Sequence, residues 1–296
     1  MNTIVDKIIK AKWYPDICRT PDEYKLLARR LHPDVCNDLS AHIAFARLTA
    51  LKNEYEKGFV FQDEAGSYRT NYLTHCWDGD LELLKRSKAN YDFMLRLAQN
   101  QFDTDSFDHF MKYVPSNLTF KGDMLVYQSK HRCIPMSKVI SLLPEEERNK
   151  HINWIYSRMI EFVVMLERIG FTHAGINPDS IFIIPETHAI KVATFYHATI
   201  GRIKSINGKY KNYYPPQLFT HKEGGSYVDI QLAKKSAICG LGDSSGSGVN
   251  LKANPLINLN VLAYLMTPES VALPSMQTWR NILNMNFIKE FITLNI

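Results

Sequence analysis

The chain contains 296 residues, of which 45% are hydrophobic and 22% charged, proportions typical of a globular protein and not of a disordered one. Its net charge of +5 is mild, and the scattered basic residues give no argument for a nucleic-acid surface. No apolar run approaches the length of about 18 residues that spans a bilayer, and no charged-then-apolar leader opens the chain, so we expect a cytoplasmic protein that contacts no membrane.

Neither a metal nor a cofactor is predicted from the motifs. The cysteines are odd in number and irregularly spaced, without a C-x-x-C pair, which argues against a disulfide framework and against a zinc cluster. They are Cys18, Cys36, Cys76, Cys133 and Cys239. The sequence also lacks H-E-x-x-H and G-x-S-x-G. The glycine-rich stretch 240–248 fits no phosphate-binding loop pattern, so we expect a flexible surface loop there.

Three helices are predicted near the amino terminus. The first covers residues 4–10, where apolar residues recur at helical spacing. The second is capped by Thr20, opens at Pro21 and stops before Pro33, because proline disfavours helix at the residue before it. The third covers residues 41–55.

The second helix and the loop after it contain a recognition motif. Basic residues lie on the side of this helix opposite its leucines, and the tripeptide His-Pro-Asp follows directly. A basic helix, an H-P-D loop and a further helix resemble the J-domain of DnaJ-type co-chaperones over roughly residues 1–58. In that family these parts dock onto a DnaK-type chaperone and stimulate its ATP hydrolysis, so the resemblance implies such a partner. The residues that it assigns to this contact are Lys25, Arg29, Arg30, His32, Pro33 and Asp34.

The tripeptide has a second interpretation. Proline and aspartate both form turns, so His-Pro-Asp is also compatible with an ordinary turn between two helices. The segment 14–18 differs as well, because it replaces the longer and more regular approach that the family usually has before the second helix.

The part of the chain after the third helix is predicted to form strands around one helix. Short strands are expected at 59–61 and 68–76, and 81–85 is compatible with another. A helix is expected over 90–99, and a hairpin over 118–127.

A long helix is predicted over 145–169. Pro144 stands at its start and three glutamates lie in its first turn, where negative charge is favourable. A loop that begins at His173 follows, and then strands at 181–184 and 190–192. Helical spacing of apolar residues continues through the carboxyl-terminal tail.

This order of elements resembles the protein-kinase fold, with the residues of the reaction replaced. Gly175 stands where an active kinase has its catalytic Asp, and Asn177 replaces the loop Lys. Ser180 replaces the Asn that binds a second magnesium ion, and Thr194 replaces the Asp of D-F-G, which binds the principal one. Because phosphoryl transfer depends on this positioning and charge neutralisation, the resemblance implies an inactive kinase-like domain.

Four further positions belong to the same comparison. His173 and Asp229 match residues that support the catalytic loop in active and inactive kinases alike. Lys85 matches the strand-three lysine that holds ATP phosphates, with Leu97 near the place of its glutamate partner, and a solvated surface lysine is the alternative. Asp179 lies four residues after the position of the catalytic Asp, so it is a candidate substitute base only if the site is shifted along the chain. Otherwise it is a turn residue between the loop and the strand.

We therefore expect an α+β protein with a small helical J-like domain over 1–58 and a bilobal kinase-like domain over 59–296, divided into lobes near 135. The combination resembles bacterial and phage DnaJ-like proteins with degenerate kinase-like regions. The hypothesis is a non-catalytic chaperone adaptor whose pseudokinase domain binds an unknown client protein. Two alternatives stay open: an atypical kinase or nucleotide-binding regulator that uses Lys85 and Asp179, and an interaction protein without chaperone work.

Overall fold

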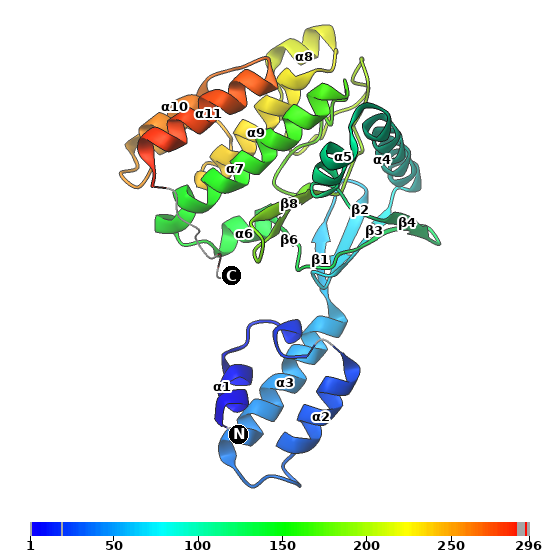
Figure 1. Ribbon diagram of the computed structural model, residues 1–296, viewed down its shortest axis with the longest axis vertical. Helices are drawn as coiled ribbons and strands as arrows, with labels where there is room; N and C mark the ends of the chain where they lie inside the picture. Colours follow the sequence, from blue (N-terminus) through cyan, green and yellow to red (C-terminus); the bar gives the residue numbers. More distant parts are fainter. Residues whose placement is uncertain (1, 19, 289–293, 295–296) are drawn as a thin grey trace. The chain divides into compact units, whose positions relative to one another are not determined.

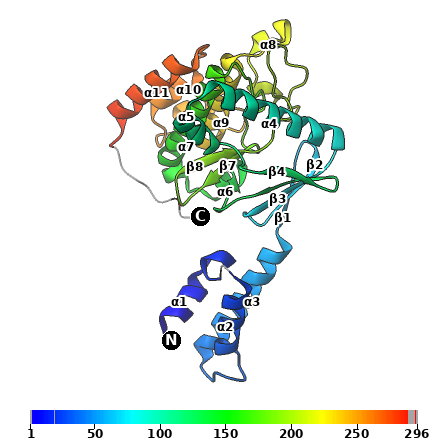
Figure 2. The ribbon, with the colours of Figure 1, turned by 45° about the vertical axis from the view of Figure 1, so that its right-hand side comes forward.

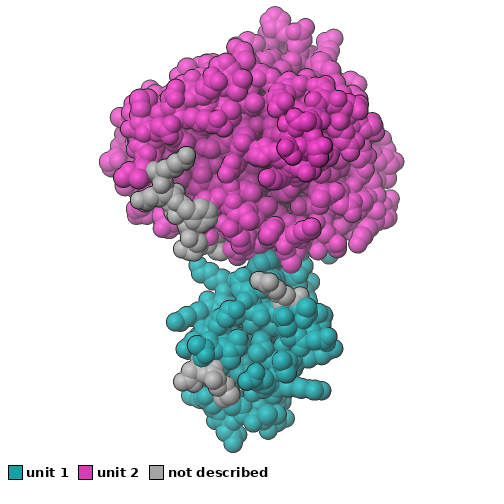
Figure 3. All heavy atoms as spheres, viewed as in Figure 1, with its two compact units in different colours: residues 1–61, 69–71 teal, residues 62–68, 72–296 magenta. Residues whose placement is uncertain are grey.

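The computed structural model describes residues 2–18, 20–288 and 294, and the chain divides into two compact units. The first comprises residues 1–61 and 69–71, and the second comprises 62–68 and 72–296 (Figure 3). Within the described ranges, no helix combines the length and the apolar character that crossing a membrane requires.

Three helices form the first unit: α1 (Asn2–Lys10), α2 (Pro21–Leu31) and α3 (Leu39–Lys57) (Figure 1). A capping box begins α2, because the Thr20 hydroxyl accepts from the Glu23 N–H and the Glu23 carboxylate accepts from the Thr20 N–H, at 3.3 and 3.4 Å. Both α1 and α2 contact α3 around a small apolar core, so the three predicted helices are confirmed. The most deeply buried side chains of this core include Ile8, Leu31, Ala44, Leu48 and Leu51. A short 3-10 turn, η1 (Tyr14–Asp16), lies between α1 and α2.

A five-stranded sheet follows, in the order β1-β2-β3-β5-β4. Its strands are β1 (Phe59–Gln62), β2 (Gly66–Thr70), β3 (Thr74–Gly79), β4 (Leu118–Lys121) and β5 (Met124–Gln128). The predicted hairpin is confirmed as β4 and β5, which pair antiparallel. The single strand expected over 68–76 was wrong, because the chain turns at Tyr72, where φ is 70°, and β3 then continues to Gly79.

The further strand with which 81–85 is compatible is not formed, because these residues begin a long helix, α4 (Leu81–Gln101). The Asp80 carboxylate caps the helix by accepting from the N–H groups of Glu82 and Leu83, at 3.0 and 3.1 Å. The helix predicted over 90–99 is the second half of the same element, which packs on β3 and β5. A further helix, α5 (Thr104–Met111), was not predicted, although Asp103 caps it in the same way.

The rest of the second unit is mainly helical and is centred on α7 (Glu145–Arg168), which contacts α9 (Ser226–Leu241) and α11 (Ala272–Asn286). The helices α7 and α9 approach closely at Gly240, where a Cβ atom would lie 2.4 Å from Cδ1 of Ile152. The remaining elements are β6 (Ile134–Pro135), α6 (Met136–Leu142), β7 (Ile181–Ile184), β8 (Ala189–Val192), η2 (Lys211–Tyr213), α8 (Pro216–His221), η3 (Val249–Ala253) and α10 (Leu259–Met266). A three-stranded sheet, β6-β7-β8, lies beside α6 and α7 (Figure 2).

The long helix and the two strands after it are thus confirmed as α7, β7 and β8. The helical tail is confirmed as α10 and α11. Residues 289–293 and 295–296 of that predicted tail lie outside the described residues.

Candidate functional site

The loop between α7 and β7 is shaped by a buried carboxylate from α9. Asp229 accepts from the backbone N–H groups of His173 and Ala174, at 2.7 and 2.8 Å. The Gly175 N–H donates to Nδ1 of His173 at 3.2 Å, so the His173 ring supports the loop from inside. Burial raises the pKa of Asp229 to about 7, in spite of the two backbone N–H groups, which lower it.

The polar residues of this loop are occupied by contacts of their own. The Asn177 side chain accepts from the N–H groups of Asp179 and Ser180, at 2.9 and 3.0 Å, and donates to the Gly175 carbonyl at 2.8 Å. The Ser180 hydroxyl donates to the Asn177 carbonyl at 3.1 Å. One oxygen of the Asp179 carboxylate accepts from the Lys209 ammonium at 2.6 Å and also from the Tyr210 hydroxyl. Residues 175–180 therefore form a turn whose polar side chains are hydrogen-bonded within the protein.

A cavity of about 450 Å³ lies against this loop. Its walls are the turn between β1 and β2, the loop itself, and the segments 194–197 and 207–209. The turn contributes Asp63 and Glu64, so the cavity is lined by three carboxylates when Asp179 is included. Thr194 and Gly175 also line it, and neither has a carboxylate to offer a metal ion or a substrate hydroxyl.

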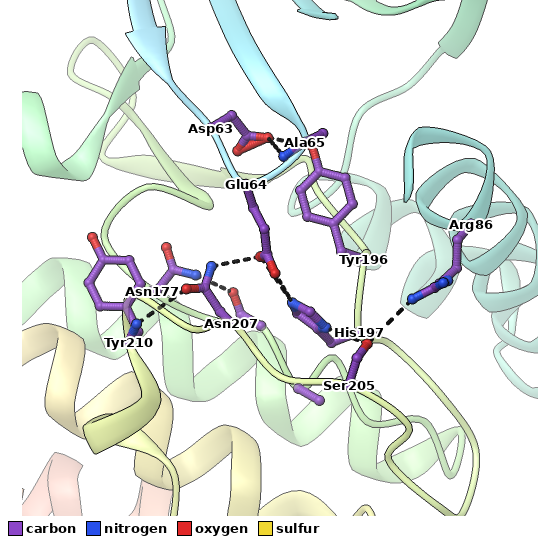
Figure 4. A network of polar contacts seen from close by, with 12 residues as sticks. Asp63, Glu64, Ala65, Arg86, Asn177, Tyr196, His197, Ser205, Asn207 and Tyr210 are labelled. Atoms are coloured by element: carbon purple, nitrogen blue, oxygen red, sulfur yellow. Dashed lines mark hydrogen bonds and ion pairs between the residues drawn. The ribbon is translucent and has the colours of Figure 1, made fainter. Parts of the chain in front are cut away.

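The β1–β2 turn is held against the segment after β8 by a polar network (Figure 4). The Glu64 carboxylate lies 2.9 Å from Nε2 of His197 and accepts from the Asn207 amide at 2.7 Å. Nδ1 of His197 lies 2.9 Å from the Ser205 hydroxyl, which also accepts from Arg86 of α4 at 3.4 Å. These contacts hold the turn over the cavity.

A second link comes from Asp63, which accepts from the Tyr196 hydroxyl. Burial raises the pKa of Asp63 from its ordinary value. None of the residues in this network was identified in the sequence. They belong to no short motif, and Glu64 and His197 stand 133 positions apart in the chain.

Aromatic rings fill the space between β3 and β7. His75 and Trp77 of β3 lie 5.4 and 6.1 Å, ring centre to ring centre, from Phe182 of β7. Tyr68 of β2 stacks on Trp77 at 5.0 Å and lies 5.7 Å from Phe182. Trp77 is 1% exposed, and burial lowers the pKa of His75 to about 3, so its ring is neutral at pH 7. His75 and Trp77 are two positions apart and therefore point to the same face of β3, and this period of two was the sequence signal that could have identified them.

Lys85 does not lie on a strand. It is in the first turn of α4, its side chain is largely exposed, and its ammonium lies 3.1 Å from the carboxylate of Glu82 on the same helix. The third strand of the sheet, β3, contains no lysine. The alternative of a solvated surface lysine therefore describes Lys85, and Trp77 faces the interior from the strand where kinases have their lysine.

Comparison with solved structures identifies the class of fold. The chain is similar to a rhoptry kinase from Toxoplasma gondii, with a TM-score of 0.52 and 14% identity over 75% of this chain and 73% of that chain. It is similar to the ROP18 kinase domain in complex with AMP-PNP and sucrose, with a TM-score of 0.52 and 12% identity over 76% and 78%. It is also similar to ROP2 from Toxoplasma gondii, with a TM-score of 0.50 and 12% identity over 76% and 79%.

ROP2 is described as a virulence factor with a protein-kinase fold and no enzymatic activity. At these identities the likeness concerns the fold alone, and the chain has a protein-kinase-like fold. No protein-family model and no curated protein matches the chain.

Proposed function

We propose that this protein is a non-catalytic adaptor. Its helical unit binds a DnaK-type chaperone through the His32-Pro33-Asp34 loop, and its kinase-like unit is a pseudokinase that binds a client or target protein. The observation that carries the proposal is a recognition loop that is intact in a chain whose phosphotransfer residues are replaced.

The interior of the kinase-like unit supports the non-catalytic part. Kinases use a lysine on strand β3 and a glycine-rich loop to hold and cover the ATP phosphates. Here β3 has Trp77 inside, and the β1–β2 turn carries Asp63 and Glu64, whose negative charge repels phosphate. The ring of Phe182 meets those of His75 and Trp77 and leaves little room for a base between β3 and β7.

The geometry of the H-P-D loop supports the chaperone-binding part. The Asp34 N–H donates to Nδ1 of His32 at 3.2 Å, and the His32 carbonyl accepts from the N–H groups of Val35 and Cys36 at 2.9 and 3.0 Å. The His32 ring also packs edge-on against Phe45 at 5.1 Å. These contacts hold the loop in one shape with Pro33 and Asp34 exposed, which lowers the entropy lost on binding.

The surface around the loop combines charge with apolar area. Lys25, Arg29 and Arg30 are exposed on α2, and such a face steers an acidic partner toward its site. Exposed apolar side chains lie on α2, in the loop and at the start of α3. They are Leu26, Val35, Leu39 and Ile43, which are 58%, 73%, 72% and 52% exposed. Apolar contact area beside a cationic face is suited to binding another protein.

The chaperone part is tested by the ATPase rate of a DnaK-type chaperone with and without this protein. We expect the wild type to raise the rate and His32→Gln to abolish the increase, because the substitution removes the ring that holds the loop and packs on Phe45. His221→Gln, at an exposed position of the kinase-like unit, is the matched control and should stimulate normally. A wild type that leaves the rate unchanged contradicts the chaperone part.

The non-catalytic part is tested by thermal unfolding with ATP, with and without Mg²⁺. We expect no change in the melting temperature of the wild type or of Lys85→Ala, because Lys85 is paired on the surface of α4 and the space between β3 and β7 is filled. An increase that requires Mg²⁺ and disappears in Lys85→Ala would instead support an atypical phosphotransferase or nucleotide-binding regulator.

A further inference from the structure

A second cavity of the kinase-like unit has cationic walls. It measures about 400 Å³ and lies among the end of α5, the middle of α7 and the β7–β8 hairpin. Its nitrogen-bearing walls include Lys112, His131, Arg158 and Lys191, and none of its lining residues is an aspartate or a glutamate. It shares no lining residue with the cavity under the β1–β2 turn.

Lys191 lines this cavity, and backbone carbonyl groups hold its ammonium group. It donates to the carbonyl groups of Met111 and Val114, at 2.8 and 2.6 Å. Desolvation lowers the pKa of Lys191 to about 8, so the Lys191 side chain is still mostly protonated and positively charged at pH 7. Among the residues that the structure describes, no carboxylate makes an ion pair with it. A half-buried ammonium held only by carbonyl dipoles leaves a positive potential in the cavity.

Arg158 adds a second positive charge to the walls, and a neighbouring carboxylate neutralises part of this charge. Its guanidinium donates to Glu161 at 3.0 Å and to the His188 carbonyl at 3.3 Å. The same Glu161 also accepts from the Tyr113 hydroxyl at 2.6 Å and lies 3.1 Å from Nε2 of His109. The single negative charge of Glu161 is therefore shared among several donors, and it does not balance the cations around the cavity.

Two cationic or ionisable groups of the walls remain available for a ligand. Lys112 and His131 are exposed, and no hydrogen bond or ion pair of either side chain occurs within the described part of the chain. Tyr113, Ile184 and Ile190 supply apolar wall beside them. The cavity therefore offers free positive charge next to a surface that can hold an organic group.

From these observations we infer that the cavity binds a phosphate monoester. A phosphate dianion has three oxygens that accept from several cationic donors at once, which suits Lys112, Arg158 and Lys191 together. The volume is at the lower end for ligand pockets, which fits a phosphate with a small organic group. That group belongs either to a small phosphorylated molecule or to a phosphorylated side chain. The inference uses neither the H-P-D loop nor the β1–β2 turn.

Calorimetric titration of the full chain at constant ionic strength tests the inference. The probes are inorganic phosphate, glycerol 3-phosphate, and a phosphoserine peptide with its unphosphorylated form. We expect saturable binding of phosphate, and about tenfold weaker binding by Lys112→Gln, equivalent to one lost charged contact. Lys121→Gln, which removes an exposed lysine of β4 that does not line the cavity, is the matched control and should bind as the wild type does.

The outcomes separate the two sources of phosphate. Tighter binding of glycerol 3-phosphate supports the inference with a small molecule as ligand, and tighter binding of the phosphoserine peptide supports it with a modified side chain. The inference is overturned by an absence of saturable phosphate binding, or by equal affinity of the wild type and the Lys112→Gln/His131→Gln double variant. Neither result depends on whether the protein stimulates a chaperone.

Discussion

Trp77→Ala is expected to lower the free energy of unfolding of the kinase-like unit by about 3–5 kcal/mol, the usual effect of removing a large buried ring. The Trp77 ring is 1% exposed and meets both Tyr68 and Phe182. Truncation removes these contacts and leaves a cavity between β3 and β7. The two strands cannot easily move together to close it, because each is paired within a different sheet.

Denaturant unfolding followed by far-UV circular dichroism measures this effect. Because the chain has two compact units, two transitions are possible, and the loss should fall on the one that belongs to the kinase-like unit. Phe93→Ala is the control, since Phe93 is an aromatic residue of α4 that is 39% exposed, and it should have a clearly smaller effect. A loss below about 1 kcal/mol for Trp77→Ala would mean that the ring is not part of a packed interior.

Asp229→Ala should destabilise the same unit by about 3–5 kcal/mol, because two buried N–H groups lose their acceptor and each such loss costs about 1–3 kcal/mol. These are the backbone N–H groups of His173 and Ala174, from which the Asp229 carboxylate accepts hydrogen bonds at 2.7 and 2.8 Å. Asp229→Asn is expected to be milder, since the amide oxygen still accepts from one of them. Urea unfolding measures both variants.

The stability that Asp229 contributes should depend on pH, and the raised pKa of Asp229 fixes the direction of the change. Burial raises the pKa of Asp229 from 3.8 to about 7, so the folded protein holds this proton more tightly than the unfolded chain does. The stability that this proton confers is complete below the unfolded value and is lost as the pH rises through about 7. The advantage of the wild type over Asp229→Asn should therefore shrink between pH 5 and pH 8. An advantage that stays constant or grows over that range contradicts the raised pKa.

Several elements could be predicted because their signals are local. The N-cap at Thr20 and the proline at position 33 predict the two ends of α2, and the apolar spacing of 145–169 predicts α7. The error at 81–85 had a local cause as well. A short apolar run does not distinguish a strand from a helix, and Asp80 was not identified as a helix cap from the sequence.

The sequence by itself determined which chemical groups stand at the positions that decide the function. Gly175 and Thr194 carry no carboxylate whatever their surroundings, and His32, Pro33 and Asp34 follow one another directly. The tertiary structure alone decided what replaces the missing groups. It brought Trp77 against Phe182, Glu64 against His197, and Lys112, Arg158 and Lys191 to one cavity. These residues are far apart in the chain, and burial and charge act between them only after the chain has folded, so no periodicity or short motif records their meeting.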